Sequence, residues 1–369
     1  AQALRVGVIG AGKHGSRYAH HIQCDVDGLT LTAISRRSEE GRLSAAQWGC
    51  RWFPRWQELI DAPEVDCVVA ALPPTLNLAV AQACARAGKP LLLEKPMATS
   101  VHEATAIIDC FHQAKVGLAI GQTLRYNTII NALRTQLPLV GSLCGLSANQ
   151  RLEPALLSWL DQPELAGAGV SFHSAIHVFD ALRYITGQEI VRVMARSRCL
   201  HSARLEDHLV VLIELESGLL GTVDCSKIGS ARSGRFELIG SQGQLHGDQV
   251  HNVLEFIQGA QRTPLACDNP VSTIVPLLRD WCRFLRGEGE NPIAAEVGLA
   301  AVRVCAACLR SAAVSARSVR WLLCWAASTL GRPAGPSIGR RPGRANCGST
   351  APSSGSTAKA ACSTRPVAP

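Results

Sequence analysis

The first third of the chain alternates between strand-like apolar runs and amphipathic helical patterns. The apolar runs occupy residues 4–9, 29–34, 67–72, 90–93 and 116–120. Apolar residues at helical spacing predict helices at residues 16–24, 39–48, 76–87 and 103–113. Strands that lack polar alternation and are separated by helices are typical of a parallel sheet covered on both faces. The pattern therefore predicts an α/β domain with a parallel sheet over residues 1–124.

The pattern changes near residue 125, where strand candidates begin to follow one another across short turns. Ser217-Gly218 and Gly240-Ser241-Gln242-Gly243 are such turns. The predicted strands occupy residues 145–150, 190–198, 208–216, 219–224, 236–239 and 244–246. A helix at 170–186 interrupts them, and helices at 272–285 and 296–310 follow. We expect an α+β domain over residues 125–314 with a large, mostly antiparallel open sheet.

Charge is distributed unevenly along the 369 residues. The formal net charge is +8, but ten of the 37 basic residues and none of the 29 acidic residues follow Glu296. The body of the chain is therefore slightly acidic and offers no basic footprint for nucleic acid. Residues 315–369 are rich in Ala, Ser, Gly, Pro and Arg, which predicts a disordered, basic, low-complexity tail. A DNA-binding or membrane-surface arm is the functional alternative for this tail.

No segment of the sequence predicts insertion into a membrane. The apolar run at residues 321–330 is shorter than the roughly 20 residues that cross a bilayer. No signal-peptide pattern precedes the first predicted strand. We therefore expect a cytoplasmic protein without a nucleic-acid or membrane partner.

A glycine-rich turn follows the first predicted strand directly. Residues 4–9 lead into Gly10-Ala11-Gly12-Lys13-His14-Gly15, a G-x-G-x-x-G motif, and a helical pattern begins after it. In such a unit Gly10 permits the tight turn, Gly12 lets the backbone approach a pyrophosphate, and Gly15 lets strand and helix pack closely. The N-terminus of the helix then points unpaired N–H groups at the phosphates. The motif predicts a dinucleotide site.

The end of the second predicted strand bears on the choice of dinucleotide. An acidic residue about 20 positions after the glycines would bind the ribose 2′-hydroxyl of NAD, but this chain has Ser35-Arg36-Arg37 there. A hydroxyl and two guanidinium groups suit a 2′-phosphate. We expect NADP in preference to NAD. The alternative is that one or both arginines only face solvent.

Three further segments give the sequence a family resemblance. They are Ala70-Ala71-Leu72-Pro73-Pro74-Thr75, the stretch Ala87-Gly88-Lys89-Pro90-Leu91-Leu92-Leu93-Glu94-Lys95-Pro96, and the helix from Gly169 to Asp180. Together with the glycine motif they resemble the Gfo/Idh/MocA oxidoreductases over about residues 3–313. The resemblance implies a Rossmann domain followed by an α+β domain. It also implies hydride transfer between a nicotinamide and a hydroxyl or carbonyl carbon of a sugar, inositol or related polyol.

Lys95 and His177 are the principal catalytic candidates. Lys95 follows a predicted parallel strand, at the sheet edge where ligands of open α/β folds bind. Its ammonium group can donate to a substrate hydroxyl, stabilise a developing alkoxide and bind substrate. The resemblance implies that His177 is the acid/base that exchanges the hydroxyl proton, for which an imidazole is well suited. A surface lysine and a core or capping histidine are the alternative interpretations.

His173 departs from the family pattern, which commonly has an aspartate at that position. On one helix His173, His177 and Asp180 are expected to share a face, so His173 is a third catalytic and substrate-binding candidate. A neutral imidazole cannot stabilise an imidazolium as a carboxylate would. A catalytically impaired, dinucleotide-binding sensor is therefore the alternative function. The histidine pair could also bind a metal ion, but no third ligand is evident and we expect no metal.

The resemblance also implies contacts from less distinctive residues. The expected cofactor contacts, beyond the glycines and Ser35-Arg36-Arg37, are Lys13, His14, Leu72, Pro73, Asn77, Glu94, Lys95 and Gln122. Arg125 and Tyr126 are expected to bind substrate, with a hinge or a structural salt bridge as the alternative. Trp159 or Asp161 would border the pocket. Related proteins associate through the second sheet, so we expect a homo-oligomer, a dimer or a tetramer.

Overall fold

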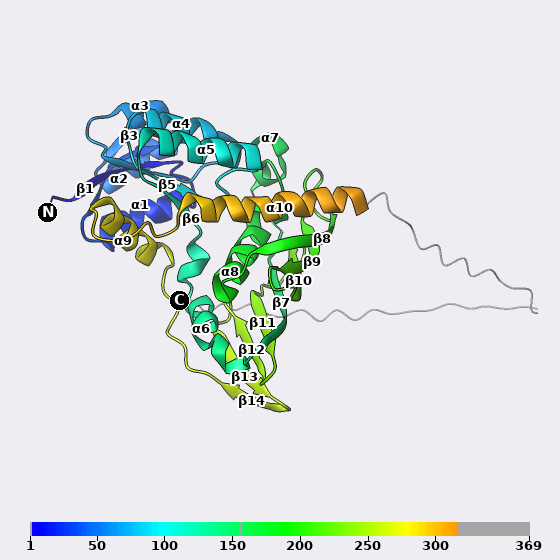
Figure 1. Ribbon diagram of the computed structural model, residues 1–369. Helices are drawn as coiled ribbons and strands as arrows, with labels where there is room; N and C mark the ends of the chain where they lie inside the picture. The colour runs from blue at the N-terminus through cyan, green and yellow to red at the C-terminus, as the bar shows by residue number, and fades with distance from the viewer. Residues whose placement is uncertain (1, 155–156, 316–369) are drawn as a thin grey trace, which may run out of the picture. The chain divides into compact units, whose positions relative to one another are not determined.

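The protein contains two sheets, of six and eight strands, in a computed structural model that describes residues 2–154 and 157–315 (Figure 1). The first sheet has the order β3-β2-β1-β4-β5-β6, and all its pairs are parallel. Its strands are β1 (Leu4–Ile9), β2 (Leu29–Ser35), β3 (Arg51–Phe53), β4 (Cys67–Ala70), β5 (Leu91–Glu94) and β6 (Leu118–Gly121). The helices between them are α1 (Gly15–Cys24), α2 (Glu39–Trp48), α3 (Trp56–Asp61), α4 (Asn77–Arg86) and α5 (Val101–Ala114). This strand order is that of a Rossmann fold.

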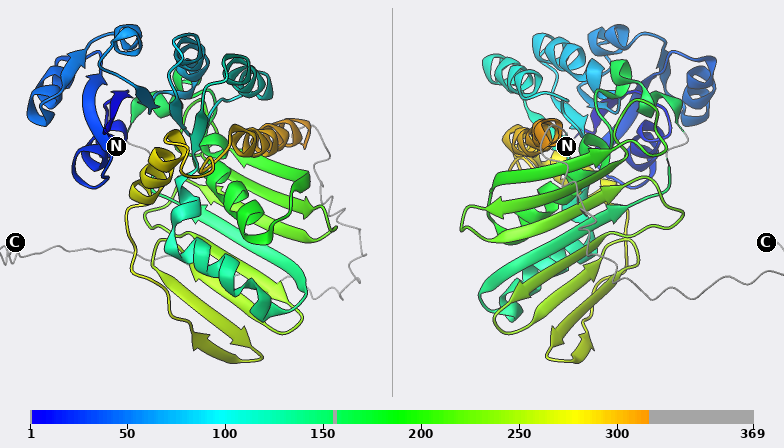
Figure 2. Two further views of the ribbon diagram at one scale, coloured as in Figure 1. Left: turned by 60° about the vertical axis from the view of Figure 1, so that its left-hand side comes forward. Right: turned by 90° about the vertical axis from the view of Figure 1, so that its right-hand side faces the viewer.

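The second sheet has the order β14-β13-β12-β11-β7-β10-β9-β8. Only the β7–β10 pair among its strands is parallel. The strands are β7 (Leu143–Arg151), β8 (Ile190–Arg198), β9 (His208–Leu215), β10 (Leu220–Ser226), β11 (Arg235–Gly240), β12 (Gln244–Asp248), β13 (Val253–Gln258) and β14 (Gln261–Pro264). The helices α6 (Thr128–Gln136), α8 (Ile176–Thr186) and α10 (Ala295–Ser315) lie on one face of this sheet (Figure 2).

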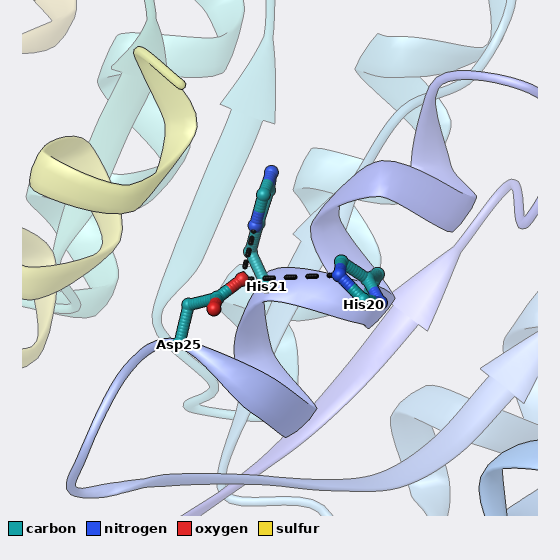
Figure 3. A group of neighbouring side chains, drawn as sticks. All are labelled: His20, His21 and Asp25. Carbon is teal, nitrogen blue, oxygen red and sulfur yellow. Dashed lines mark hydrogen bonds and ion pairs between the residues drawn. The ribbon is translucent and has the colours of Figure 1, made fainter. Parts of the chain in front are cut away.

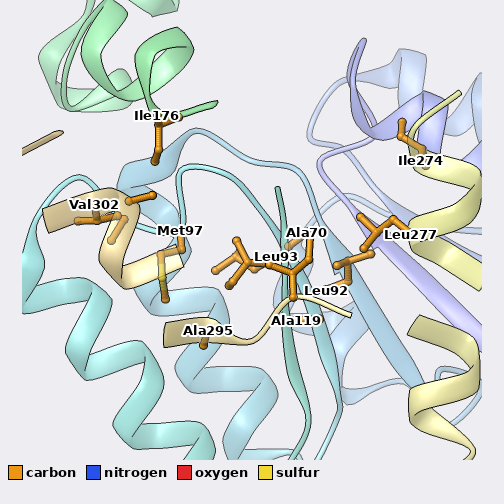
Figure 4. Packing of buried hydrophobic residues seen from close by; sticks show 14 of the residues in the cluster. Ala70, Leu92, Leu93, Met97, Ala119, Ile176, Ile274, Leu277, Ala295 and Val302 are labelled. Atoms are coloured by element: carbon orange, nitrogen blue, oxygen red, sulfur yellow. The ribbon is translucent and has the colours of Figure 1, made fainter. Parts of the chain in front are cut away.

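The closing segment of the described chain returns to the first sheet. Helix α9 (Ile274–Leu285) packs against α1, and the N–H of Ile120 in β6 donates to the carbonyl of Ile293. Helix α10 then contacts α5, α8 and β8. Figure 4 shows Val302 of α10 in the same buried cluster as Met97 and the strand residues Leu92 and Leu93. One continuous apolar core therefore joins the two sheets.

The structure confirms the predicted fold class, with a parallel Rossmann-type sheet and a large, mostly antiparallel second sheet. The strands β3, β13 and β14 and the helices α3, α6 and α7 (Pro163–Ala166) were not predicted. Strand β3 has only three residues, and β14 (Gln261–Pro264) is exposed at the sheet edge, so neither shows a buried period-2 pattern. The predicted tail at residues 315–369 falls outside the described residues, apart from Ser315 at the end of α10.

The length and composition of α10 bear on the prediction that no segment inserts into a membrane. One helix in the described part of the chain, at residues 295–314 of α10, is long and apolar enough to cross a bilayer. Its buried side includes Ala301, Val302, Cys305 and Cys308. In the structure this side packs between β8, α8 and α5, which is the environment of a core helix in a globular fold.

Candidate active site

The glycine turn lies between β1 and α1, and its three glycines meet different surroundings. Gly10 has φ +85°, and a Cβ there would lie 2.3 Å from the carbonyl oxygen of Ala71. A Cβ on Gly15 would lie 2.2 Å from the Gly10 carbonyl oxygen, whereas a Cβ on Gly12 would meet nothing within 4 Å. Gly10 and Gly15 thus permit a close backbone approach, and Gly12 faces open space. This loop fits a dinucleotide, because the space at Gly12 is where a pyrophosphate would approach the backbone.

The end of β2 lies beside this turn. The backbone N–H groups of Gly10 and Ala11 both donate to the Ser35 carbonyl oxygen, at 3.0 and 3.2 Å. The Arg36 guanidinium pairs with Glu40 and donates to the Ala11 carbonyl oxygen. Arg37 is exposed, and no hydrogen bond or ion pair of its side chain occurs among the described residues. The two arginines therefore differ, since only Arg37 has its guanidinium free to bind a ligand.

The carboxylate of Glu94 is buried at the end of β5 and joins three segments of the site. It accepts hydrogen bonds from the Tyr18 hydroxyl and the Lys95 backbone N–H, and it lies 3.0 Å from Nε2 of His14. Burial by itself would raise the pKa of Glu94. The hydrogen bonds and charges of His14, Lys95 and Tyr18 outweigh burial and hold that pKa below its usual value. Glu94 therefore holds the N-terminal end of α1, through His14 and Tyr18, next to the backbone of Lys95.

Lys95 connects the first sheet to the helix that carries the histidines. Its Nζ donates to the backbone carbonyl oxygen of His173 at 3.0 Å. Burial lowers the pKa of Lys95, and the neighbouring charge of Glu94 opposes that shift. Behind it, the Asn77 side-chain amide donates to the carbonyl oxygens of Pro96 and Met97. Asn77 thus supports the loop that presents Lys95.

The two predicted histidines lie at the start of the α8 segment, but the helix geometry there differs from the prediction. Residues Ser171–Ala175 form a π-helical turn, and the α-helix begins only at Ile176. Nε2 of His173 and Nδ1 of His177 are both buried without a hydrogen-bond partner. Burial and the nearby positive charge of Lys227 lower the pKa of His173 to about 3. Burial and the charge of Lys95 hold the pKa of His177 well below its usual value. Both imidazoles are therefore neutral near pH 7.

Asp180 and Arg125 form a salt bridge. The Asp180 carboxylate accepts two hydrogen bonds from Arg125, at 2.7 and 2.9 Å. The Asp180 side chain is 1% exposed, so its carboxylate is shielded from water. The Tyr126 hydroxyl likewise donates to Asp280 of α9. These contacts favour the structural alternative for Arg125 and Tyr126 over substrate binding.

The remaining predicted cofactor residues differ in their surroundings. Lys13 and His14 are exposed at the turn, and Leu72 lies 3.0 Å from the position of a Gly10 Cβ. Pro73 precedes a short 3₁₀ turn whose Thr75 hydroxyl donates to the carbonyls of Glu164 and Leu165. The Gln122 side chain, just after β6, is 1% exposed and neither polar atom has a partner. A buried amide without partners is expected where a ligand supplies them.

A pocket that sequence analysis did not assign adjoins this group. It has a volume of about 230 Å³ and is lined by His173, Asp161, Glu206 and Lys227, among others. Trp159 contacts the edge of the His173 ring with ring centroids 5.9 Å apart. Lys227 and Glu206 carried no sequence signal, because each is a single charged residue beside a strand and only the sheet topology brings them to His173. Of the two residues expected at the pocket, Asp161 lines it, whereas Trp159 contacts only the His173 ring.

One group of side chains in the described residues has the spacing of a metal site, and it lies away from these residues. It consists of His20, His21 and Asp25 at the end of α1 (Figure 3). The His21 ring already has partners at both nitrogens, because Nδ1 lies 2.6 Å from Asp25 and Nε2 lies 2.9 Å from the Ser272 hydroxyl. A metal ion would displace these contacts. We interpret the group as a hydrogen-bonded link between α1 and the start of α9.

The fold and this arrangement define a class of protein: a dinucleotide-binding oxidoreductase with a second α+β domain. Comparison of the sequence with protein families specifies the class further. Residues 4–122 match the Gfo/Idh/MocA oxidoreductase family with its NAD-binding Rossmann fold, and residues 145–246 match a C-terminal domain of the same family. The chain belongs to the Gfo/Idh/MocA family and is an NAD(P)-dependent oxidoreductase that acts on CH–OH groups.

Individual relatives agree with this assignment. The chain is 29% identical to the myo-inositol 2-dehydrogenase of Thermotoga maritima over 67% of its own length and 76% of the relative's. It is also 29% identical to inositol 2-dehydrogenase 1 of Saccharopolyspora erythraea, over 84% and 94% of the two chains. Among solved structures, an aldose-aldose oxidoreductase from Caulobacter crescentus matches with a TM-score of 0.78 at 22% identity, over 85% and 98% of the chains. A levoglucosan dehydrogenase in complex with NADH and levoglucosan matches with a TM-score of 0.77 at 21% identity, over the same shares of the two chains.

Proposed function

We propose that the protein is an NADP-preferring dehydrogenase of a sugar, inositol or related polyol, with Lys95 and His177 as its catalytic residues. The observation that carries this proposal is the 3.0 Å hydrogen bond from Lys95 Nζ to the His173 carbonyl. That bond joins the carboxyl edge of the parallel sheet to the turn that leads into His177. The relatives named as inositol and sugar dehydrogenases support the substrate class.

The residues divide the chemistry between them. When bound, the nicotinamide ring supplies the hydride acceptor in the oxidation direction. The unpartnered Nδ1 of neutral His177 accepts the proton of the substrate hydroxyl, and this makes the alkoxide a better hydride donor. The Lys95 ammonium stabilises the negative charge that develops on that oxygen. Glu94 fixes the backbone of Lys95 through the Lys95 N–H.

Steady-state kinetics of the full chain test this assignment. We would measure kcat/KM with NADP⁺ across inositols and aldoses for the wild type, for Lys95→Met and for His177→Asn. Each substitution removes a group that acts on the reacting oxygen, and general acid–base groups contribute about 10²–10⁴-fold, so we expect kcat to fall by at least about 100-fold. His102→Asn, at an exposed position in α5, is the matched control and should retain full activity. Tight dinucleotide binding without turnover of any substrate would favour the sensor alternative instead.

The preference for NADP depends on the end of β2. No carboxylate stands at residues 35–37, and the exposed Arg37 guanidinium flanks the segment that bonds the glycine turn. Replacing Arg37 by Ala removes a charge-assisted hydrogen bond, which is worth a factor of about 10 or more in affinity for the 2′-phosphate. We expect the ratio of NADPH to NADH affinity to fall by that factor. Arg42→Ala is the control, and an unchanged ratio in Arg37→Ala would contradict the proposal.

The outer face of the second sheet supports a further part of the proposal, that two copies associate through it. Large apolar side chains are exposed at alternate positions of neighbouring strands. The register places Met194 of β8 opposite Leu212 of β9, and Val210, two residues earlier on β9, opposite Asp224 of β10. The exposed members are Met194, Val210, Leu212, Leu220 and Ile239. An apolar patch of this kind on a sheet face is typical of an interface. Light scattering should show an oligomer for the wild type and a monomer for Leu212→Glu; a monomeric wild type would refute this part.

A further inference from the structure

The pocket beside His173 contains a lysine that the proposed chemistry does not use. Lys227 follows strand β10 directly, and its backbone N–H donates to the Asp207 carbonyl. Its side chain lines the pocket with His173 and Glu206, yet its Nζ forms no hydrogen bond or ion pair with any described residue. A lysine that is not exposed is normally paired, because desolvating an ammonium group is costly.

The carboxylates that line the same pocket are already occupied by protein donors. Asp161 accepts the backbone N–H groups of Ala203, Arg204 and Leu205. Asp207 accepts those of residues 200, 201 and 202. Glu206 accepts the backbone N–H groups of Gly169 and Ser171 and the Ser171 hydroxyl. These acids hold the walls of the pocket in place through hydrogen bonds and leave Lys227 without a direct partner.

The groups nearest to Lys227 do not neutralise it either. The charge of Lys95 acts on it unfavourably, and that of Glu206 favourably. His173 also lines the pocket, and its Nε2 is buried without a hydrogen-bond partner. With burial as the largest cause, the pKa of Lys227 is lowered to about 8, so the group is still mostly protonated at pH 7. Among the described residues that line the pocket, Lys227 is therefore a cation without a direct partner.

We propose that Lys227 binds a carboxylate of the substrate, so that the dehydrogenase acts on acidic sugars or polyols. The inference rests on the proposed function and names its substrate class more narrowly. The main-chain carbonyl of His173 bonds Lys95 while its ring lines the pocket, so the pocket adjoins the reacting groups. A substrate that reacts at Lys95 and His177 can extend its carboxylate past His173 to Lys227. A carboxylate fits better than a phosphate ester, because no arginine lines the pocket and the N–H groups of the adjoining helix N-terminus, at Gly169, Val170 and Ser171, already donate to Glu206.

Matched pairs of neutral and acidic sugars test this inference on the full chain. We would measure kcat/KM with NADP⁺ for D-glucose against D-glucuronate and for D-galactose against D-galacturonate, with D-glucose 6-phosphate as a third arm. Binding of each sugar to the NADP⁺-loaded protein would be measured by calorimetry in parallel. We expect the acidic member to be preferred in binding and in turnover, because it alone supplies a counter-ion to Lys227. Lys227→Met should lower the acidic-to-neutral ratio by about 10-fold or more, Lys227→Arg should retain part of it, and His102→Asn should leave it unchanged.

The outcomes separate this inference from the proposed function. Equal losses for acidic and neutral sugars in Lys227→Met would mean a structural role and overturn the inference, as would preference for the phosphate ester. Turnover of neutral sugars without binding of any uronate would overturn it while leaving the dehydrogenase proposal intact. Calorimetric binding of a uronate that Lys227→Met abolishes, without turnover of any sugar, would support the carboxylate site and refute the dehydrogenase proposal. Absence of uronate binding in every case overturns the inference.

Discussion

Two alanine substitutions in one turn separate packing from cofactor binding. Gly12→Ala places a methyl group in space that is empty within 4 Å, whereas Gly15→Ala places one 2.2 Å from the Gly10 carbonyl oxygen and 2.9 Å from its carbon. Both positions lack a positive φ, so an L side chain is not strained by the backbone at either. The two variants differ only in what the new methyl group meets.

The expected magnitudes follow from that difference. The neighbour of Gly15 is backbone and cannot rotate away, so overpacking should cost about 1–3 kcal/mol, reduced by at most about 1 kcal/mol of gained helix propensity. Gly12→Ala should change the free energy of unfolding by less than about 0.5 kcal/mol, because it makes no new contact. Its methyl group instead occupies the approach of the pyrophosphate, and we expect NADPH affinity to fall at least about 10-fold, or about 1.4 kcal/mol.

Urea unfolding without cofactor and fluorescence titration with NADPH measure the two effects separately. Gly15→Ala should be destabilised, and Gly12→Ala should unfold like the wild type but bind NADPH weakly. Normal NADPH affinity in Gly12→Ala would show that the open space does not face the phosphates. Wild-type stability in Gly15→Ala would refute the tight approach of strand and helix.

Three further predictions test the surroundings of the site. Arg125→Met leaves the buried Asp180 carboxylate with only Arg183, at 3.5 Å, and should lower the free energy of unfolding by about 1–3 kcal/mol. Normal stability with a raised KM would instead favour substrate binding by Arg125. His173 is neutral in the folded protein, with a pKa of about 3, while the unfolded chain takes up its proton below about pH 6.5. The free energy of unfolding should therefore fall by about 1.4 kcal/mol per pH unit below 6.5 on account of this group, and urea unfolding of His173→Gln at pH 7 and pH 5 should show a smaller pH dependence. The cluster at His21 is held by protein hydrogen bonds, so EDTA should leave the thermal midpoint unchanged, and a fall of several degrees would indicate a metal ion.

The sequence predicts the architecture well because each sheet has its own periodic signature. Strand β1 is an apolar run, whereas β9 alternates buried and outward residues, as parallel and half-covered antiparallel strands require. Helix α6 was missed because it has only nine residues in a region of strands and turns. The family motifs located Lys95 and the His173–His177 turn, and the structure brings the two segments into contact.

Partners that are distant in sequence explain what could not be predicted. Arg125 and Asp180 are 55 residues apart, and no local pattern shows that they pair. The assumption of a regular α-helix also failed at the π-helical turn of Ser171–Ala175, where side-chain directions no longer follow the spacing of four. Lys227 reaches the site because β10 packs against the Ser171–Ala175 turn, a contact between segments about 50 residues apart that no local pattern predicts.

Two features of the pocket together leave it with an unbalanced positive charge. The family resemblance places an aspartate at position 173, where this chain has an imidazole that burial keeps neutral. The same pocket contains Lys227, a cation without a direct partner among the described residues. An aspartate at position 173 would lie in the wall of that pocket and could neutralise such a lysine, and its loss leaves the charge to be balanced from outside the protein. A substrate carboxylate would supply that balance and would also fix the substrate relative to Lys95 and His177. The histidine is therefore better explained as a change of substrate class than as a loss of catalysis.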